Sequence, residues 1–183
     1  MLKNSNKSYG WLSIAVHWLM AIAILFMFSL GLYMVELTYY DAWYKGSLDL
    51  HKSLGMVLLG LLMFRVFWRA TNIKPAELAG PKWEQRSAHW MHRGLYLGML
   101  CLMISGYLIS TADGRAIVIF DLLKAPALPW AIEKQEDIAG QVHAILSWLL
   151  IAMTTAHALA AIKHHFINKD GGLTRMLKVN TTV

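Results

Sequence analysis

Residues 138–162 read IAGQVHAILSWLLIAMTTAHALAAI and contain no Asp, Glu, Lys or Arg over 25 positions. Because about 20 apolar residues suffice for an α-helix to cross the hydrocarbon core of a bilayer, this segment predicts a membrane-spanning helix. It also carries two histidines, His143 and His157. Ionisable side chains are costly inside a membrane and are usually kept for a function. The segment therefore indicates both an integral membrane protein and a chemical site within it.

Three further stretches extend this pattern. There are 28 uncharged residues between Lys7 and Glu36 and 19 between Arg93 and Asp113. A shorter apolar stretch, from Leu54 to Trp68, is interrupted by Arg65, whose long side chain can snorkel toward the membrane surface. The sequence predicts four spans, at about 12–35, 48–68, 92–112 and 138–163, in a single domain over residues 1–183.

The composition supports a membrane protein and excludes several chemistries. Of the 183 residues, 57% are hydrophobic and only 15% are charged, which is unlike a disordered or an ordinary soluble chain. The one cysteine, Cys101, excludes a disulfide framework, a covalent haem attachment motif and a thiolate-bound iron–sulfur cluster. The fold class expected is an all-α integral membrane four-helix bundle.

The charges predict the orientation of the bundle. Of the 17 Lys and Arg residues, 12 lie in the N-terminal segment, in the connection from Arg65 to Arg93 and in the C-terminal tail. The other two connections hold the remaining five cations and eight of the 11 acidic residues. Since Lys and Arg accumulate in cytoplasmic segments, both termini are expected to be cytoplasmic. The net charge of +6 reflects this topology, and no nucleic-acid partner is expected.

Histidines are the main chemical signal, and their predicted depths group them. Fourteen residues separate His143 from His157, which places them within about 40° of one helix face and about 21 Å apart along the axis. His51, at the outer end of its span, is the partner expected for His143. Three histidines lie at the inner ends of other spans and are candidate partners of His157, namely His17, His89 and His92.

Two facing imidazoles suit the two axial positions of a haem iron. Tetrahedral zinc is less suitable, because it needs three or four ligands at one depth and the last two spans contain no acidic residue. A flat macrocycle also needs room beside its ligands, which small side chains provide. The residue four positions after His17 is Ala21, whereas Arg93 and Tyr96 follow His89 and His92 at that spacing. This difference favours His17 as the partner of His157.

Several matching stretches resemble the bacterial cytochrome b561 family. They are SIAVHWL from Ser13, HKSLG from His51, GYLISTADG ending at Gly114, VHA around His143 and HALAAIKHHF from His157. The resemblance covers about Tyr9 to Leu177. It implies a multi-pass protein of the bacterial inner membrane with two haem b groups, whose axial ligands match His17, His51, His143 and His157. One type of relative, the superoxide oxidase, passes electrons from periplasmic superoxide to ubiquinone.

The ligand set predicts how such a protein works. Iron with two histidine ligands has no open position, so each haem is expected to act as a one-electron relay. The donor expected is superoxide or a periplasmic redox partner, and the acceptor is ubiquinone, as in a superoxide:ubiquinone oxidoreductase. Candidate groups for quinone binding or proton delivery are His89, His92, Arg69 and Arg93. Candidate partners of haem propionates are Lys52, Arg65, Arg69 and Arg93.

Three alternatives remain open at this point. Electrons could flow the other way, from quinol to a periplasmic partner protein. The histidines could belong to a metal transporter, although a transmembrane acidic residue would then be expected. The bundle could also be a haem-free membrane anchor for a partner enzyme, which would need none of the four buried histidines.

Overall fold

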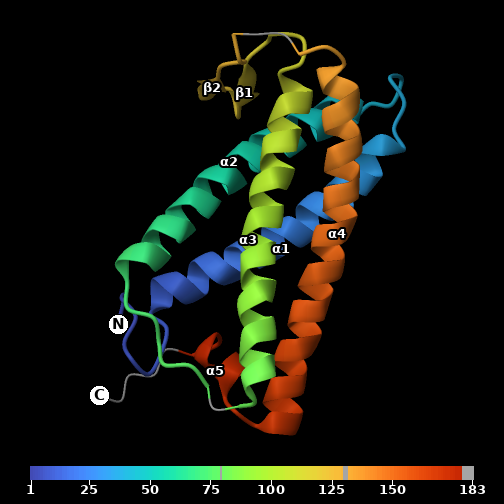
Figure 1. Cartoon of the computed structure of the whole chain (residues 1–183). Helices are drawn as coiled ribbons and strands as arrows, with labels where there is room; N and C mark the ends of the chain where they lie inside the picture. Colours follow the sequence, from blue (N-terminus) through green and yellow to red (C-terminus); the bar gives the residue numbers. More distant parts are fainter. Residues whose placement is uncertain (79, 130–131, 179–183) are drawn as a thin grey trace.

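Four long helices make up almost all of the computed structural model, which describes residues 1–78, 80–129 and 132–178. They are α1 (Trp11–Val35), α2 (Tyr44–Thr71), α3 (Lys82–Ser110) and α4 (Gln135–Lys163) (Figure 1). Each is long and apolar enough to cross a membrane. The predicted all-α integral four-helix bundle is confirmed.

The helix boundaries differ from the predicted spans mainly at α3. This helix begins at Lys82, ten residues before the predicted start at 92, and α2 begins at Tyr44 rather than at 48. The added turns of α3 contain Lys82, Glu84 and Arg86, which an apolar-stretch criterion leaves out. Lys, Glu and Arg nevertheless have high helix propensity, so the helix continues beyond its apolar part.

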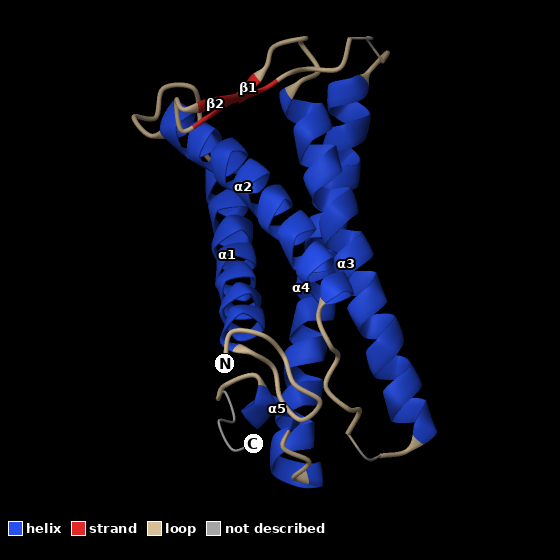
Figure 2. Cartoon of the chain, turned by 90° about the vertical axis from the view of Figure 1, so that its left-hand side faces the viewer, coloured by secondary structure: helices blue, strands red, loops and turns tan. Residues whose placement is uncertain are grey.

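The bundle consists of two helix pairs. Helix α3 packs along α4, and α1 packs along α2, while α2 also contacts α3. Direct contact between α1 and α4 is sparse. Figure 2 shows α2 crossing toward α3, while the ends of these two helices that lie away from the strands diverge. The two pairs therefore meet chiefly through α2 and α3.

A small core joins all four helices near the middle of the bundle. Its buried members are Val16, Met20, Leu58, Leu62, Met99 and Leu150. Leu150 lies midway between His143 and His157 on α4. Elsewhere large apolar side chains face outward, for example Ile22, which is 64% exposed, and Leu97, which is 62% exposed. Contiguous exposed apolar surface of this kind marks contact with lipid.

A β-hairpin lies at one end of the bundle, between α3 and α4. Strand β1 (Ile117–Ile119) pairs antiparallel with β2 (Leu123–Ala125) through a turn in which Phe120 and Asp121 have positive φ. Ser53 of α2 holds this hairpin, because its Oγ accepts from the Phe120 N–H at 3.2 Å and donates to the Val118 carbonyl at 3.4 Å. The sequence predicted only an irregular loop here.

After Pro126 and Pro129, the sequence of this loop also predicts a short helix near Ala131 to Gln135. Ala131 lies outside the described residues, and Gln135 is the first residue of α4. Ile132 to Lys134 are not helical, and Lys134 has a φ of 55°. The short helix was therefore wrong for the part of this segment that the structure describes.

The N-terminus lies at the opposite end of the bundle (Figure 1). There α4 continues as the π-helix η1 (His164–Asn168) and ends before the turn that contains Gly171, whose φ is +74°. The short helix α5 (Gly172–Arg175) follows. Trp18 of α1 donates its indole N–H to the Met176 carbonyl at 2.7 Å, which ties this C-terminal segment to the bundle.

Candidate histidine sites at the two ends of the bundle

The structure brings His51 of α2 and His143 of α4 together at the hairpin end. Their ring centroids are 6.3 Å apart, with an angle of 70° between the ring planes. His143 Nδ1 lies 3.0 Å from the Leu102 carbonyl oxygen and 3.1 Å from Ser105 Oγ. Because a carbonyl only accepts, Nδ1 of the neutral ring carries the proton and Nε2 keeps its lone pair for a ligand.

Two glycines give these rings their space. A Cβ on Gly106 of α3 would lie 3.1 Å from His143 Cε1, and one on Gly31 of α1 would lie 3.5 Å from His51 Cε1. The first distance is tighter than a normal van der Waals contact, so Gly106 allows α3 to approach the ring. No role was predicted for Gly106, Ser105 or the Leu102 carbonyl. The only sequence signal for the first two is that they are a pair of adjacent small residues within the third span.

Three histidines gather at the other end of the bundle. The ring centroids of His17 (α1) and His157 (α4) are 6.4 Å apart, and those of His92 (α3) and His157 are 5.2 Å apart. Arg65 Nη2 lies 2.9 Å from His17 Nδ1. Since a guanidinium can only donate, His17 Nδ1 is the acceptor in this contact. The guanidinium of Arg65 also lies 5.6 Å from the centroid of the Tyr96 ring.

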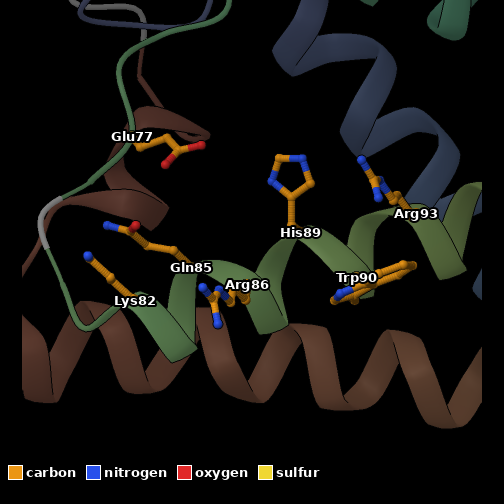
Figure 3. Close-up of a pocket in the computed structure, with 7 residues that line it drawn as sticks. All are labelled: Glu77, Lys82, Gln85, Arg86, His89, Trp90 and Arg93. Atoms are coloured by element: carbon orange, nitrogen blue, oxygen red, sulfur yellow. The ribbon is translucent and has the colours of Figure 1, made fainter.

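The other predicted site residues fall into separate places. Arg69 lies against Tyr96, with 5.6 Å between its guanidinium carbon and the ring centroid, so it accompanies Arg65. Lys52 is half-buried beside His51 on α2. Arg93 instead lies 5.1 Å from the Trp90 ring centroid and, together with His89, lines a different pocket on α3 (Figure 3). The predicted quinone and propionate residues therefore do not form a single cluster.

The distance between the two imidazole rings fits a shared metal ion in two of these histidine pairs, one at each end of the bundle. Two imidazoles bonded at about 2.0–2.1 Å to opposite sides of one metal hold their ring centroids about 6.4 Å apart. His51 with His143, at 6.3 Å, and His17 with His157, at 6.4 Å, match this value. The 5.2 Å between His92 and His157 is too short for it.

The environment of the rings also supports a ligand shared by the paired histidines. His51 Nδ1 is buried and has no hydrogen-bond partner among the described residues. A buried polar atom without a partner needs an explanation such as a ligand group that bonds to that atom. In the described part of the chain, no three His, Cys, Asp or Glu side chains converge as a structural zinc site requires. Paired histidines at two depths of a four-helix membrane bundle are the arrangement expected of a membrane cytochrome b.

The comparisons with known proteins agree with this class. Residues 8–178 match the family model described as prokaryotic cytochrome b561. The chain therefore belongs to the prokaryotic cytochrome b561 family, whose members carry b-type haem and transfer electrons in the membrane.

Two curated relatives cover nearly the whole chain. "Cytochrome b561 homolog 2" of Escherichia coli (strain K12) is 44% identical over 175 residues, which are 95% of this chain and 93% of the relative. "Probable superoxide oxidase CybB" of Yersinia pestis is 29% identical over 181 residues, 94% of this chain and 97% of the relative. "Cytochrome b561 homolog 1" of Escherichia coli (strain K12) is 27% identical over 135 residues, 70% of this chain.

Proposed function

We propose that this protein binds two haem b groups and transfers electrons from superoxide on the outer side of a bacterial inner membrane to ubiquinone near the cytoplasmic side. The observation that carries the proposal is the pair of equal histidine spacings, 6.3 Å and 6.4 Å, at opposite ends of α4. About 21 Å of helix separates their two α4 members. The similarity to a probable superoxide oxidase supports the choice of donor.

The four proposed axial ligands are His51 with His143 at the outer end and His17 with His157 at the inner end. When bound, haem supplies one-electron transfer, while the protein supplies ligands that leave no open position for oxygen. The Leu102 carbonyl orients His143 by accepting its Nδ1 proton. The apolar core around Leu150 keeps water and ions out of the region between the sites.

Arg65 has a further role in this proposal. A neutral imidazole that binds iron through Nε2 carries its proton on Nδ1, where it can no longer accept from Arg65. Binding of His17 to iron would therefore release the guanidinium of Arg65, which is half-buried and would favour an anionic partner. A haem propionate is the partner we propose for Arg65.

The electron and proton balance defines what the inner end must provide. Two superoxide anions give up one electron each and become oxygen, and ubiquinone takes up two electrons and two protons. His92 is the proposed proton donor at the quinone, because its ring lies beside that of His157 and it is not one of the four proposed axial ligands. Arg69 is exposed and lies against Tyr96, and it is the proposed contact for a quinone oxygen.

The test uses the purified holoprotein and single His→Ala variants. Wild type is expected to contain two haem b per chain, and each variant at positions 17, 51, 143 or 157 is expected to lose one of them. His92→Ala is the matched control, because it touches His157 but is expected to keep both haems. If all four ligand variants keep two haems, the assignment is wrong. Superoxide followed by ubiquinone, added to the same sample, should reduce and then reoxidise the visible bands.

The opposite direction of flow is a second candidate, because one observation favours it. The outer connections carry eight acidic residues against five Lys and Arg. This net negative surface would attract a cationic acceptor protein more readily than a superoxide anion. Reduction of both haems by ubiquinol, with no response to superoxide, would support this candidate.

A further inference from the structure

The pocket in Figure 3 is separate from the histidine pairs and has its own chemistry. It lies at the inner end of α3, beside the connection from α2, and has a volume of about 380 Å³. Three permanently charged cations line it, namely Lys82, Arg86 and Arg93, together with His89. Glu77, which reaches in from the connection, is the one carboxylate in its lining.

The cations of this pocket are not neutralised by the protein. Among the described residues, Lys82, Arg86 and Arg93 take part in no salt bridge. The nearby carboxylate of Glu84 is engaged elsewhere, because it accepts from Lys163 Nζ at 2.6 Å. Arg93 makes only a cation–π contact, with 5.1 Å to the Trp90 ring centroid. A pocket with several free cations against one carboxylate favours an anionic ligand.

The pocket is also placed where a lipid headgroup lies. Trp90, at its rim, is 68% exposed, and tryptophan side chains settle at the level of the headgroups. Leu97 follows seven residues later, on nearly the same face of α3, and is 62% exposed. Leu97 lines an apolar groove of about 260 Å³ between α3 and α4. Arg93 of the polar pocket and Gly94 of the apolar groove are consecutive in α3, and a polar pocket with an apolar groove next along the helix suits an amphiphile.

We propose that this pocket binds the phosphate of an anionic phospholipid, with one acyl chain lying along Trp90 and Leu97. Arg and Lys are the side chains that bind phosphate oxygens through charge-assisted hydrogen bonds. Basic pockets beside membrane helices are known to take anionic headgroups on the cytoplasmic side. A ubiquinone headgroup is uncharged and gives no reason for three unpaired cations. The proposal does not depend on the number of haems or on the electron donor.

The experiment counts bound lipids by native mass spectrometry on delipidated holoprotein in a neutral detergent. Phosphatidylglycerol and phosphatidylcholine with the same acyl chains are added in turn. Wild type is expected to bind one phosphatidylglycerol in clear preference to phosphatidylcholine. The double variant Lys82→Gln/Arg86→Gln is expected to bind it roughly 25-fold more weakly, since each cation near the membrane surface contributes about fivefold.

The matched control is Lys3→Gln/Lys7→Gln, which removes the same charge from the N-terminal segment at the same end of the bundle. This variant is expected to bind phosphatidylglycerol as wild type does. Equal binding of the two lipids, or equal losses in both double variants, would overturn the proposal. Displacement of the lipid by inorganic phosphate alone would identify a free-phosphate site, and displacement by ubiquinone would reassign the pocket to quinone. Haem content, measured on the same samples, should not change.

Discussion

Gly106 is the residue at which one added methyl group should affect the outer site most directly. In Gly106→Ala, the new Cβ would lie 3.1 Å from His143 Cε1 and would press on the ring from α3. We expect the outer haem to be lost or its low-spin bands to be altered, because an axial ligand must keep its orientation. Haem content and the visible spectrum of the purified variant measure this effect.

The control for this prediction is Gly60→Ala in α2. A Cβ at Gly60 would meet nothing within 4 Å, so the spectrum should not change. Helix stability should rise by up to about 1 kcal/mol, because alanine replaces glycine inside a helix. If both variants keep a wild-type spectrum, the tight contact at Gly106 does not constrain His143.

Lys52 provides a second test by a single substitution, here of superoxide as the electron donor, because it is the cation next to His51 in the chain. Arg115 is less available, since it forms an ion pair with Asp113, and this hydrogen-bonded contact holds the pKa of the Asp113 carboxyl below its usual range. The pair therefore remains charged at neutral pH. In Lys52→Gln we expect superoxide to reduce the haem roughly threefold more slowly, because a local attraction for the anion is lost.

Stopped-flow reduction by superoxide measures this rate, and Arg115→Gln serves as the control with little expected change. The effect at Lys52 should shrink as salt is added, because salt screens exposed charges. An unchanged rate in Lys52→Gln at low salt would count against superoxide as the donor.

Sequence alone could indicate which histidines matter, but not what holds them. Depth and the fourteen-residue spacing identified His143 and His157 as members of one face, and the structure places each beside a histidine of another helix. Their role as haem ligands stays a prediction. The hydrogen bond from His143 to Leu102 could not be predicted, because it depends on how α3 is rotated against α4. The same rotation brings His92 against His157.

Among the secondary-structure elements, the outer hairpin is the one that depends on a single side chain. Ser53 Oγ makes both hydrogen bonds that link α2 to the hairpin, at 3.2 Å to the Phe120 amide and 3.4 Å to the Val118 carbonyl. Ser53→Ala leaves that amide without its partner, which costs about 1–3 kcal/mol where water cannot replace it. We expect faster hydrogen exchange in residues 117–125 and no change in the exchange of α4.

Ser29→Ala is the matched control, because Ser29 bonds only to the Leu25 carbonyl of its own helix. It should leave the exchange of the hairpin unchanged. Equal protection of the hairpin in wild type and in Ser53→Ala would mean that the strand pairing holds it without Ser53.

The secondary-structure elements also show which features of the fold could be predicted from the sequence. Long uncharged stretches predicted α1, α3 and α4, because hydrocarbon length sets a minimum that is easy to recognise. Helix α2 was predicted from a shorter apolar stretch, on the argument that the side chain of Arg65 can snorkel. The hairpin was missed, because its strands have three residues each and its turn uses Phe120 and Asp121 at positive φ instead of a glycine pair. The ten extra residues of α3 were missed because three of them, Lys82, Glu84 and Arg86, are charged and interrupt the apolar stretch.

For the whole molecule, the proposed cofactors would connect two helix pairs that otherwise meet mainly through α2 and α3. Each proposed ligand pair joins a histidine of the α1–α2 pair to one of α4, although α1 and α4 have little direct contact. Removing haem should therefore lower the stability of the folded bundle. A ligand present at 100 times its dissociation constant stabilises the folded state by about 2.7 kcal/mol.

We expect the haem-free protein to have a lower Tm and to be cleaved more readily by protease in the connection between α2 and α3. Adding haem back should restore both properties. The reference is a sample that passes through the same extraction without losing its haem. Identical Tm values for the two samples would show that the helices hold together without the cofactors.

His143 and His157 lie on one helix. The relative direction of their rings and the distance between them therefore depend on how many residues separate them, and much less on which side chains those residues carry. A single inserted residue would turn one histidine by about 100° relative to the other and direct one ring away from its partner. An insertion of seven residues would nearly restore the direction but would move the two sites about 10 Å farther apart. The thirteen residues between these histidines can therefore exchange one apolar side chain for another, whereas insertions and deletions among them should be excluded from functional members of the family.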